Sequence, residues 1–334
     1  MADYININGN NIPIRASDPT NPIQGEVWYN TTTNALKGQG LGSSSWASGG
    51  NLPTGTQSAA GWGIQTSAVN TTGNIPSNLC TNATSEYNGT SWSGGTNYPA
   101  IRQGSGAFGA SETSGVVFGG AIPTNNQPTF TFHNDTNEYD GSTWTSGGTY
   151  PQTIQAVGAS GILTAGLSAS GTNTAPGGPG LTGLSAEYNG TSWTAVNSLN
   201  TTNDARHNRM WGVQNSSIAS GQATPLPNIE AYDGTSWSTI NTLSSARPGV
   251  GAGFGANSTE GVLVGSPPAG TEVESFDGTS WSSDTALPTG GSQQARAGTA
   301  SLGLIIGGTQ NPPNLTATLE YTGAGPTTVT FSSS

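Results

Sequence analysis

The chain has 334 residues, of which 32% are hydrophobic, 7% are charged and 51 are glycine, and its formal net charge is −11 with only seven Lys and Arg residues. So few cations cannot form the basic stripe that nucleic-acid binding needs, and they also disfavour adsorption to an anionic membrane surface. The chain has no apolar run long enough to cross a bilayer, so we expect no membrane insertion. Low charge argues against disorder, and the aromatic, glycine-rich composition predicts a folded, turn-rich β protein.

The first 46 residues are predicted to form a separate N-terminal segment. Pro13, Pro19 and Pro22 prevent a long helix or a central strand before residue 25. Residues 25–37 then have the pattern of a hairpin, with an aromatic strand, a Thr-rich turn and a second strand that ends at Lys37. The start of the chain lacks the basic and apolar regions of a signal peptide, which predicts synthesis in a cytoplasm. The single cysteine, Cys80, agrees with a reducing compartment.

Residues 47–334 repeat one short signature, in which Glu and an aromatic residue precede Asn-Gly or Asp-Gly, two hydroxyl residues and Trp. Asn-Gly and Asp-Gly favour tight turns, and the flanking aromatic residues suit one face of a sheet. The Trp residues stand 52, 49, 44 and 44 residues apart, and a unit of about 40 to 50 residues with four strands is typical of a propeller blade. The copies are Glu86–Trp92, Glu138–Trp144, Glu187–Trp193, Glu230–Trp237 and Glu274–Trp281.

A weaker pattern connects these signatures. Each Trp is followed by Tyr or Leu beside Pro or a small residue, and often by an Arg, at positions 102, 206, 247 and 296. Short apolar runs closed by glycines follow, as in 115–120, 261–265 and 302–308, and these predict buried inner strands. We expect the glycines to let backbones crowd near a propeller axis.

The order of these elements resembles the kelch repeat family over residues 50–332. The resemblance implies a kelch-like β-propeller of four-stranded antiparallel sheets in which the repeated Tyr and Trp are structural. Six blades are predicted, and seven remain open if residues 26–46 pair with the C-terminal strands. The last repeat, Leu319–Gly323, lacks the Trp, and residues 324–334 are expected to form a final strand. The predicted blades are 47–94, 95–146, 147–195, 196–239, 240–283 and 284–332.

The residues that could carry chemistry are few, and we predict no catalytic, cofactor-binding or metal-binding residue and no cofactor. His133 and His207 are far apart in sequence and have no metal-ligand spacing, and Cys80 with them does not match the copper oxidases of the kelch class. The oxygen-rich stretch 134–140 lacks the spacing of a calcium loop. A Glu recurs in every repeat, and we predict that it has a structural role in each blade, in which it pairs with a backbone amide or with the repeated Arg. A glycosidase would instead need one pair of acids beside the sugar bond. The recurring Glu residues are Glu86, Glu138, Glu187, Glu230, Glu274 and Glu320.

Three stretches rich in Gly, Asn and Pro, residues 65–85, 121–136 and 168–185, are predicted to be long loops on a common face, because each precedes the signature of its blade.

The opening of the chain also resembles short hairpins of tailed-bacteriophage tail-fibre and virion proteins, with Ser-Asp-Pro-Thr-Asn-Pro at 17–22 before it. The resemblance implies a non-enzymatic structural or adhesion protein of the particle, such as a tail fibre, spike or decoration, located in the virion. Its expected partners are other virion proteins and a host-surface glycan or receptor bound through propeller loops, and a homo-oligomer is left open. One alternative is a polysaccharide-degrading enzyme on the same scaffold, whose candidate acids are Asp135, Asp204 and Glu260. Another is a cellular kelch-type interaction adaptor.

Overall fold

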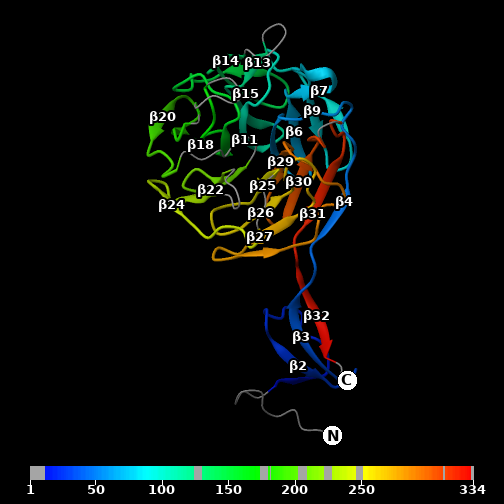
Figure 1. Ribbon diagram of the computed structural model, residues 1–334. Helices are drawn as coiled ribbons and strands as arrows, with labels where there is room; N and C mark the ends of the chain where they lie inside the picture. The colour runs from blue at the N-terminus through cyan, green and yellow to red at the C-terminus, as the bar shows by residue number, and fades with distance from the viewer. Residues whose placement is uncertain are drawn as a thin grey trace. The chain divides into compact units, whose positions relative to one another are not determined.

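The computed structural model describes residues 12–123, 130–173, 180, 182–201, 209–221, 228–245, 251–310 and 313–331. The chain divides into two compact units (Figure 1): unit 1 comprises Met1–Ser45 and Gly323–Ser334, and unit 2 comprises Trp46–Thr322. Among the described residues the only helical element is a short 3-10 turn, η1 (Pro76–Asn78), and no helix is long and apolar enough to span a membrane.

Unit 2 is a β-propeller, so the predicted all-β propeller fold is confirmed. Its described residues form six four-stranded antiparallel sheets, and the first strands of these sheets contact one another in a closed cycle around an axis. We name the sheets blades 1 to 6. Blade 1 contains β5 (Ala60–Ile64), β6 (Ser67–Thr71), β9 (Thr84–Tyr87) and β10 (Trp92–Gly94), and blade 2 contains β11 (Gly106–Ser111), β12 (Ser114–Phe118), β15 (Thr136–Tyr139) and β16 (Trp144–Ser146).

The remaining blades have the same order from the axis outward. Blade 3 contains β17 (Gly158–Ile162), β18 (Ala165–Ala169), β19 (Ser185–Tyr188) and β20 (Trp193–Val196). Blade 4 contains β21 (Met210–Val213), β22 (Ser216–Ser220), β23 (Ile229–Tyr232) and β24 (Trp237–Thr239). Blade 5 contains β25 (Ala252–Phe254), β26 (Gly261–Val264), β27 (Val273–Phe276) and β28 (Trp281–Ser283). Blade 6 contains β29 (Ala295–Gly298), β30 (Leu302–Ile306), β31 (Thr318–Thr322) and, from the other end of the sequence, β4 (Ser45–Ser48).

The repeated signature is the turn between the third and fourth strands of blades 1 to 5. The Asn or Asp side chain accepts hydrogen bonds from two backbone amides of the turn, as Asp233 does from Thr235 and Ser236, each at 2.8 Å. The following Gly has a positive φ, which is 93° at Gly234. The aromatic residues beside the turn pack together, with ring centroids 4.9 Å apart in Tyr87–Trp92 and 4.6 Å apart in Tyr139–Trp144. The predicted hairpin and the packing of Tyr and Trp on one sheet face are therefore confirmed.

Blade 6 obtains its missing Trp from β4. The rings of Trp46 and Tyr321 lie 4.9 Å apart, and the Trp46 indole donates to the carbonyl of Thr285 at 2.8 Å. The strand supplied by residues 45–48 therefore gives the last blade the Tyr and Trp pair of blades 1 to 4, for which blade 5 has Phe276 and Trp281. The predicted boundary between residues 46 and 47 falls within this strand.

We expect Trp46→Ala to lower the free energy of unfolding of unit 2 by about 2 kcal/mol, less than for a fully buried Trp because the ring is partly exposed. Denaturant unfolding followed by Trp fluorescence measures this loss. Ser48→Ala, at an exposed position of the same strand, is the control and should change little. Equal, small effects of the two substitutions would show that Trp46 does not hold the ring closed.

Aromatic side chains of the first strands pack into glycines of the next blade. A Cβ on Gly115 would lie 2.1 Å from Trp62 Cε2, and one on Gly166 would lie 2.1 Å from Phe108 Cζ. Trp211 occupies the same place over Gly261, and Phe254 over Gly303. Between blades 3 and 4, where both positions are serine, the Oγ atoms of Ser160 and Ser217 are hydrogen-bonded at 2.7 Å. Glycine is therefore required at these positions because the aromatic ring of a neighbouring blade occupies the place of a side chain. This explanation is more specific than the predicted crowding of backbones near the axis.

The recurring Glu residues also connect the blades. Tyr139 donates to Glu86 at 2.5 Å and Tyr232 to Glu187 at 2.9 Å, and the same bond joins Tyr87 to Glu320 and Tyr188 to Glu138. In blades 4 and 5 the carboxylates accept backbone amides instead: Glu230 from Asn200 and Thr201, and Glu274 from Ser244. These contacts confirm the predicted architectural role of the acids. The predicted backbone amides are the partners of Glu230 and Glu274, and in the other four blades the partner is a Tyr hydroxyl, which was not predicted.

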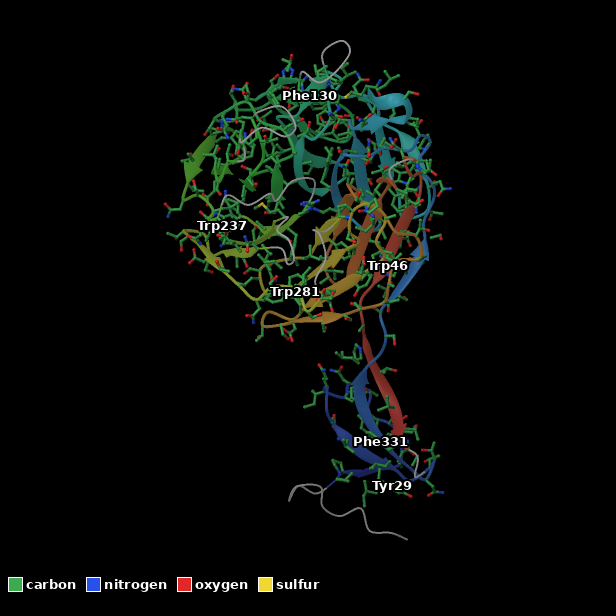
Figure 2. All side chains as sticks on the ribbon, viewed as in Figure 1. Tyr29, Trp46, Phe130, Trp237, Trp281 and Phe331 are labelled. Carbon is green, nitrogen blue, oxygen red and sulfur yellow. The ribbon has the colours of Figure 1, made fainter. Side chains whose placement is uncertain are left out.

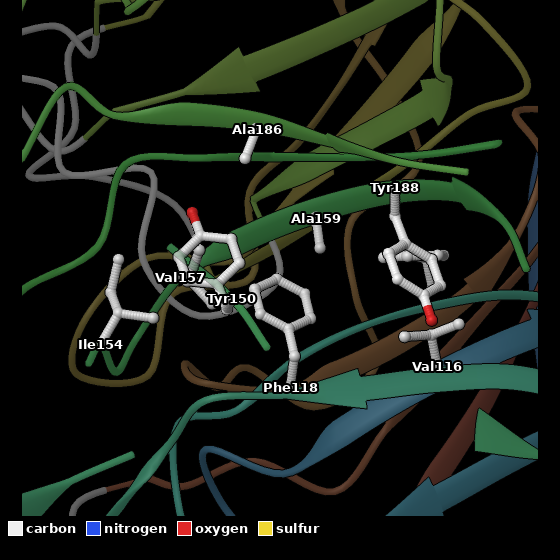
Figure 3. Packing of buried hydrophobic residues seen from close by; sticks show 9 residues of the cluster. Val116, Phe118, Tyr150, Ile154, Val157, Ala159, Ala186 and Tyr188 are labelled. Atoms are coloured by element: carbon white, nitrogen blue, oxygen red, sulfur yellow. The ribbon is translucent and has the colours of Figure 1, made fainter. Parts of the chain in front are cut away.

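The buried core follows these blade interfaces. Figure 3 shows the cluster between blades 2 and 3, where the rings of Phe118 and Tyr150 lie 4.9 Å apart beside Ile154 and Val157. Tyr150 belongs to the segment that enters blade 3, and it is 1% exposed. The corresponding Tyr98, Leu199, Leu243, Leu287 and Leu52 are also buried. The Tyr or Leu of the weaker sequence pattern is therefore the buried anchor of each connection between blades.

Unit 1 is a four-stranded sheet in the order β1 (Ile14–Arg15), β2 (Val27–Asn30), β3 (Ala35–Leu41) and β32 (Pro326–Phe331). The β2–β3 hairpin was predicted, and Asn34 has a φ of 50° in its turn. β32, which the sequence had placed in the propeller, pairs with β3 here, so both ends of the chain contribute to unit 1. The division into 1–46 and 47–334 therefore differs from the two units of the structure, because β4 and β32 each pair with a distant part of the sequence.

Asp18 is the centre of the contacts on one face of this sheet. Its carboxylate accepts hydrogen bonds from the Trp28 indole at 3.0 Å, the Asn30 amide at 2.7 Å and the Lys37 ammonium at 2.7 Å. These donors, led by Lys37, lower the pKa of Asp18 to about 2. The Asp of the 17–22 motif therefore ties the N-terminal segment to the hairpin that follows it.

Candidate functional site

The two faces of the propeller differ in their connections. The turns between first and second strands and between third and fourth strands are short, and we call the side that carries them the hairpin face. The opposite side, which we call the loop face, carries the connections between second and third strands and those between blades. The predicted long loops lie on the loop face in blades 1 to 3, as residues 72–83, 119–135 and 170–184. In blades 1 and 3 they begin later than predicted, because β6 and β18 extend into the predicted ranges, and in blade 2 the loop begins slightly earlier. Residues 124–129, 174–179 and 181 lie outside the described residues.

Two small hairpins project from the loop face on neighbouring blades. In blade 1, β7 (Asn74–Ile75) pairs with β8 (Leu79–Cys80), and in blade 2, β13 (Ala121–Pro123) pairs with β14 (Phe130–Phe132). Figure 2 marks Phe130 on the second hairpin, whose partly buried rings Phe130 and Phe132 lie 6.4 Å apart. Leu79 is 60% exposed, and Ile101, in the segment between the hairpins, is 45% exposed.

Backbone hydrogen bonds fix these hairpins to the ring. The segment between blades 1 and 2 pairs on one side with Thr81, through Arg102, and on the other with Ala121, through Gln103. Close to the axis, the amide of Gly104 donates to the carbonyl of Ser58 at 2.9 Å, and the amide of Ser58 donates to Gln293 at 3.1 Å. The amide of Ala156 donates to the carbonyl of Gly104 in the same way. These four residues, each just before the first strand of its blade, have a positive φ: 51° at Ser58, 64° at Gly104, 55° at Ala156 and 55° at Gln293. Left-handed backbone at non-glycine residues carries strain and persists where the surroundings impose it, so the base of the loop face is rigidly determined.

A polar cluster lies beneath the two hairpins. The buried Arg102 guanidinium donates to Asp135 Oδ1 at 2.8 Å, and Asn137 donates to the Tyr98 hydroxyl at 2.9 Å and to Asp135 at 3.2 Å. His133 Nδ1 is 3.8 Å from Asp135, and burial together with the Arg102 cation lowers the pKa of His133. Burial raises the pKa of Tyr98 above its usual range, and the Asp135 charge acts in the same direction. Each charge is balanced within the cluster, which therefore suits the positioning of the loops better than proton transfer.

Arg296 crosses the axis of the ring. This side chain of β29 donates through Nη2 to the carbonyls of Ala159, on β17 at 2.5 Å, and Met210, on β21. It is buried, and desolvation lowers its pKa to about 10. Most corresponding positions of the other first strands are small, namely Gly61, Ala107, Ala159 and Gly253, and this leaves room for one long side chain. Arg296 thus closes the axial space below the loop face.

Buried polar atoms with no hydrogen-bond partner among the described residues concentrate in the loop-side half of the blades. Such atoms need water or a ligand to satisfy them, since each carries a desolvation cost of about 1–3 kcal/mol when it is left alone. The atoms include Asn70 Oδ1, Thr72 Oγ1, Asn74 Oδ1, Arg102 Nε, His133 Nε2, Ser220 Oγ and Arg296 Nε.

The residues singled out in the sequence do not come together. Asp135 lies on the loop face, but Glu260 lies in the turn between β25 and β26 on the hairpin face, where it accepts the amide of Ala256 at 3.0 Å. These two acids cannot flank one glycosidic bond, and Asp204 and His207 lie outside the described residues, as do Arg206 and Arg247. In the 134–140 stretch, Asp135 faces Arg102, Glu138 accepts Tyr188 and Asp140 accepts its own turn amides. Across the described ranges no group of three or more His, Cys, Asp or Glu side chains could hold a metal ion.

The sequence did not indicate several residues that shape this face. Ser58, Ala156 and Gln293 give no signal, because nothing in a serine, alanine or glutamine predicts left-handed backbone. Ile101 and Leu79 could have been found as isolated aliphatic residues in polar loops.

The comparisons with known proteins support the fold and give no family for the chain. No protein-family model matches the chain, and no curated protein matches it either. Among solved structures, the chain is similar to one described as "Structure of YjhT", with a TM-score of 0.65 and 12% sequence identity. The similarity covers 83% of this chain and 99% of that one, so the whole of that structure corresponds to most of this protein.

Proposed function

We propose that this protein is a non-enzymatic structural or adhesion component of a tailed-bacteriophage particle, such as a tail fibre, spike or decoration. In this proposal the propeller is of the kelch-like type and binds a host-surface glycan or another virion protein through its loop face. Unit 1, whose sequence resembles the opening hairpin of tail-fibre and virion proteins, would attach it to the particle.

The observation that carries the binding proposal is the construction of the loop face in blades 1 and 2. The first hairpin exposes Leu79, and the second carries the partly buried rings of Phe130 and Phe132. Backbone pairing through Arg102 and Gln103 holds both hairpins on the ring. Binding residues on loops that a rigid scaffold positions are the usual arrangement in proteins. The loops that carry these hairpins are rich in Asn and Thr, whose amide and hydroxyl groups suit the hydroxyl groups of a glycan.

The chain provides a matched pair of variants to test this face. Ile101 on the loop face and Ile64 on the hairpin face are the same residue type and are each 45% exposed. We expect Ile101→Asp to weaken binding of the fluorescent protein to host cells or to purified particles by at least about tenfold, because a charge is introduced at a contact surface. Ile64→Asp should leave binding unchanged, and the reverse result would assign binding to the hairpin face.

The particle assignment has its own test. Mass spectrometry of purified virions should detect the polypeptide, and its absence from particles would favour a cellular kelch-type adaptor. Release of oligosaccharides from host polysaccharide by the purified protein would instead support the enzyme alternative, with acids other than the Asp135 and Glu260 pair.

A further inference from the structure

The two faces of the unit 1 sheet differ sharply in chemistry. Residues directly opposite each other on neighbouring strands place their side chains on the same face. The registers Ile14↔Tyr29, Tyr29↔Leu36 and Leu36↔Phe331 therefore put these four residues on one face. The registers Val27↔Gly38 and Gly38↔Val329 add Val27 and Val329 to it. We call this set the apolar face: Ile14, Val27, Tyr29, Leu36, Val329 and Phe331.

The other face holds the charges of the sheet and is the covered one. It carries Trp28, which is fully buried, and the contacts of Trp28, Asn30 and Lys37 with Asp18. The four described charged residues of unit 1 form two ion pairs, Arg15–Glu26 and Lys37–Asp18. Arg15 and Lys37 lie opposite Asn30 and Trp28, respectively, and so they belong to the covered face. The apolar face consequently has no charged side chain among the described residues.

Large hydrophobic groups remain exposed on the apolar face. Ile14 is 71% exposed, Phe331 is 50% exposed and Val329 is 38% exposed. Phe331 is held on the sheet, because its ring fills the place of a side chain at Gly38, where a Cβ would lie 2.9 Å from Phe331 Cε2. Figure 2 marks Phe331 and Tyr29 on this sheet. Antiparallel sheets with one solvated face normally present polar residues there, so this arrangement is typical of a surface that is covered in an assembly.

We propose that unit 1 associates with a second copy of this chain through the apolar face. A charged or hydrogen-bonding partner would find no charged group to recognise on this surface, whereas a second copy brings the same uncharged, apolar surface. The chain carries a net charge of −11, and two copies can approach here without bringing like charges together. A self-complementary patch closes around a twofold axis. The proposal is independent of the phage assignment and of ligand binding at the loop face.

Sedimentation equilibrium of the full chain tests the proposal. We expect a dimer at micromolar concentration, and we expect Val329→Asp or Phe331→Asp to raise the dissociation constant at least about tenfold, since each places two like charges in the interface. Thr328→Asp and Thr330→Asp lie on the same strand but on the opposite face, and as matched controls they should leave the dissociation constant unchanged. Val329→Thr, which keeps a β-branched side chain, should weaken association by a smaller factor and guards against misfolding of the aspartate variants.

Two results would overturn the proposal. A wild-type chain that is monomeric at all concentrations would show that the apolar face is not covered by a second copy. Equal weakening by substitutions on both faces of β32 would show that charge anywhere on the strand disturbs the sheet, and the apolar face would then have no special part in association.

Discussion

Gly115→Ala should destabilise the propeller by about 3 kcal/mol, because the new Cβ would lie 2.1 Å from Cε2 of Trp62. The Trp62 ring cannot retreat easily, since it is fully buried and its indole donates to the carbonyl of Ser111 at 2.9 Å. Equilibrium denaturation in urea measures the loss. Gly94→Ala is the control: Gly94 lies in the outer strand β10, a Cβ there meets nothing within 4 Å, and stability should change little.

A double-mutant cycle identifies the cause. Trp62→Ala alone should cost about 3–5 kcal/mol, as for other buried large-to-small changes. With Trp62 already replaced, Gly115→Ala should become nearly neutral, because the ring that excludes the methyl group is gone. Additive losses in the cycle would mean that Gly115 is required for a reason other than the Trp62 ring, such as its backbone conformation.

The propeller should lose stability steeply between about pH 10 and pH 12. Burial, together with the carboxylate of the preceding blade, raises the pKa of Tyr87, Tyr139 and Tyr188 to about 12. In an unfolded chain a tyrosine ionises near pH 10. A raised folded-state pKa means that the stabilisation is fully present below pH 10 and is lost as the pH rises toward 12, because the unfolded state then releases protons that the folded state retains. Phenolate absorbance and unfolding should therefore rise together.

The matched variant replaces these three tyrosines by phenylalanine, for which Phe276 of blade 5 is a natural precedent. The variant should be less stable at neutral pH, by about 1 kcal/mol for each hydrogen bond lost. Its stability should also depend less on pH above 10. If the wild-type tyrosines ionise near pH 10 while the protein stays folded, the bonds between Tyr and Glu do not govern the alkaline transition.

The propeller could be predicted because its signature is local. The turn chemistry of Asp233-Gly234 and the pairing of Tyr232 with Trp237 lie within six residues, so every copy reveals the same hairpin. The Tyr partner of the Glu residues could not be predicted in this way, because its hydroxyl comes from the next blade. Glu230 accepts backbone amides, as predicted, where blade 5 has Phe276 in place of a Tyr. The sequence did contain one unused signal: Trp46 stands apart from any signature, and the last repeat, around Tyr321, lacks a Trp.

The loop face was predictable only in outline. Gly- and Asn-rich stretches marked where the connections are long. The segments that enter the blades near the axis, in contrast, turn at Ser58 and Ala156 through positive φ angles that these residue types do not favour. The contact of Arg102 with Asp135 joins residues 33 apart in sequence, and Arg296 reaches carbonyls on the far side of the ring. Such contacts follow from the closed arrangement of the blades, which no single repeat encodes.

The origin of β4 has a consequence for synthesis of the protein. Trp46, which completes blade 6, is synthesised long before its partner Tyr321. Blades 1 to 5 can assemble in order as the chain lengthens, but blade 6 must wait with an unfilled edge until β31 has been synthesised. A nascent chain stalled before residue 318 would therefore hold an open arc of sheets, and the ring would close in a single step once β31 has been synthesised.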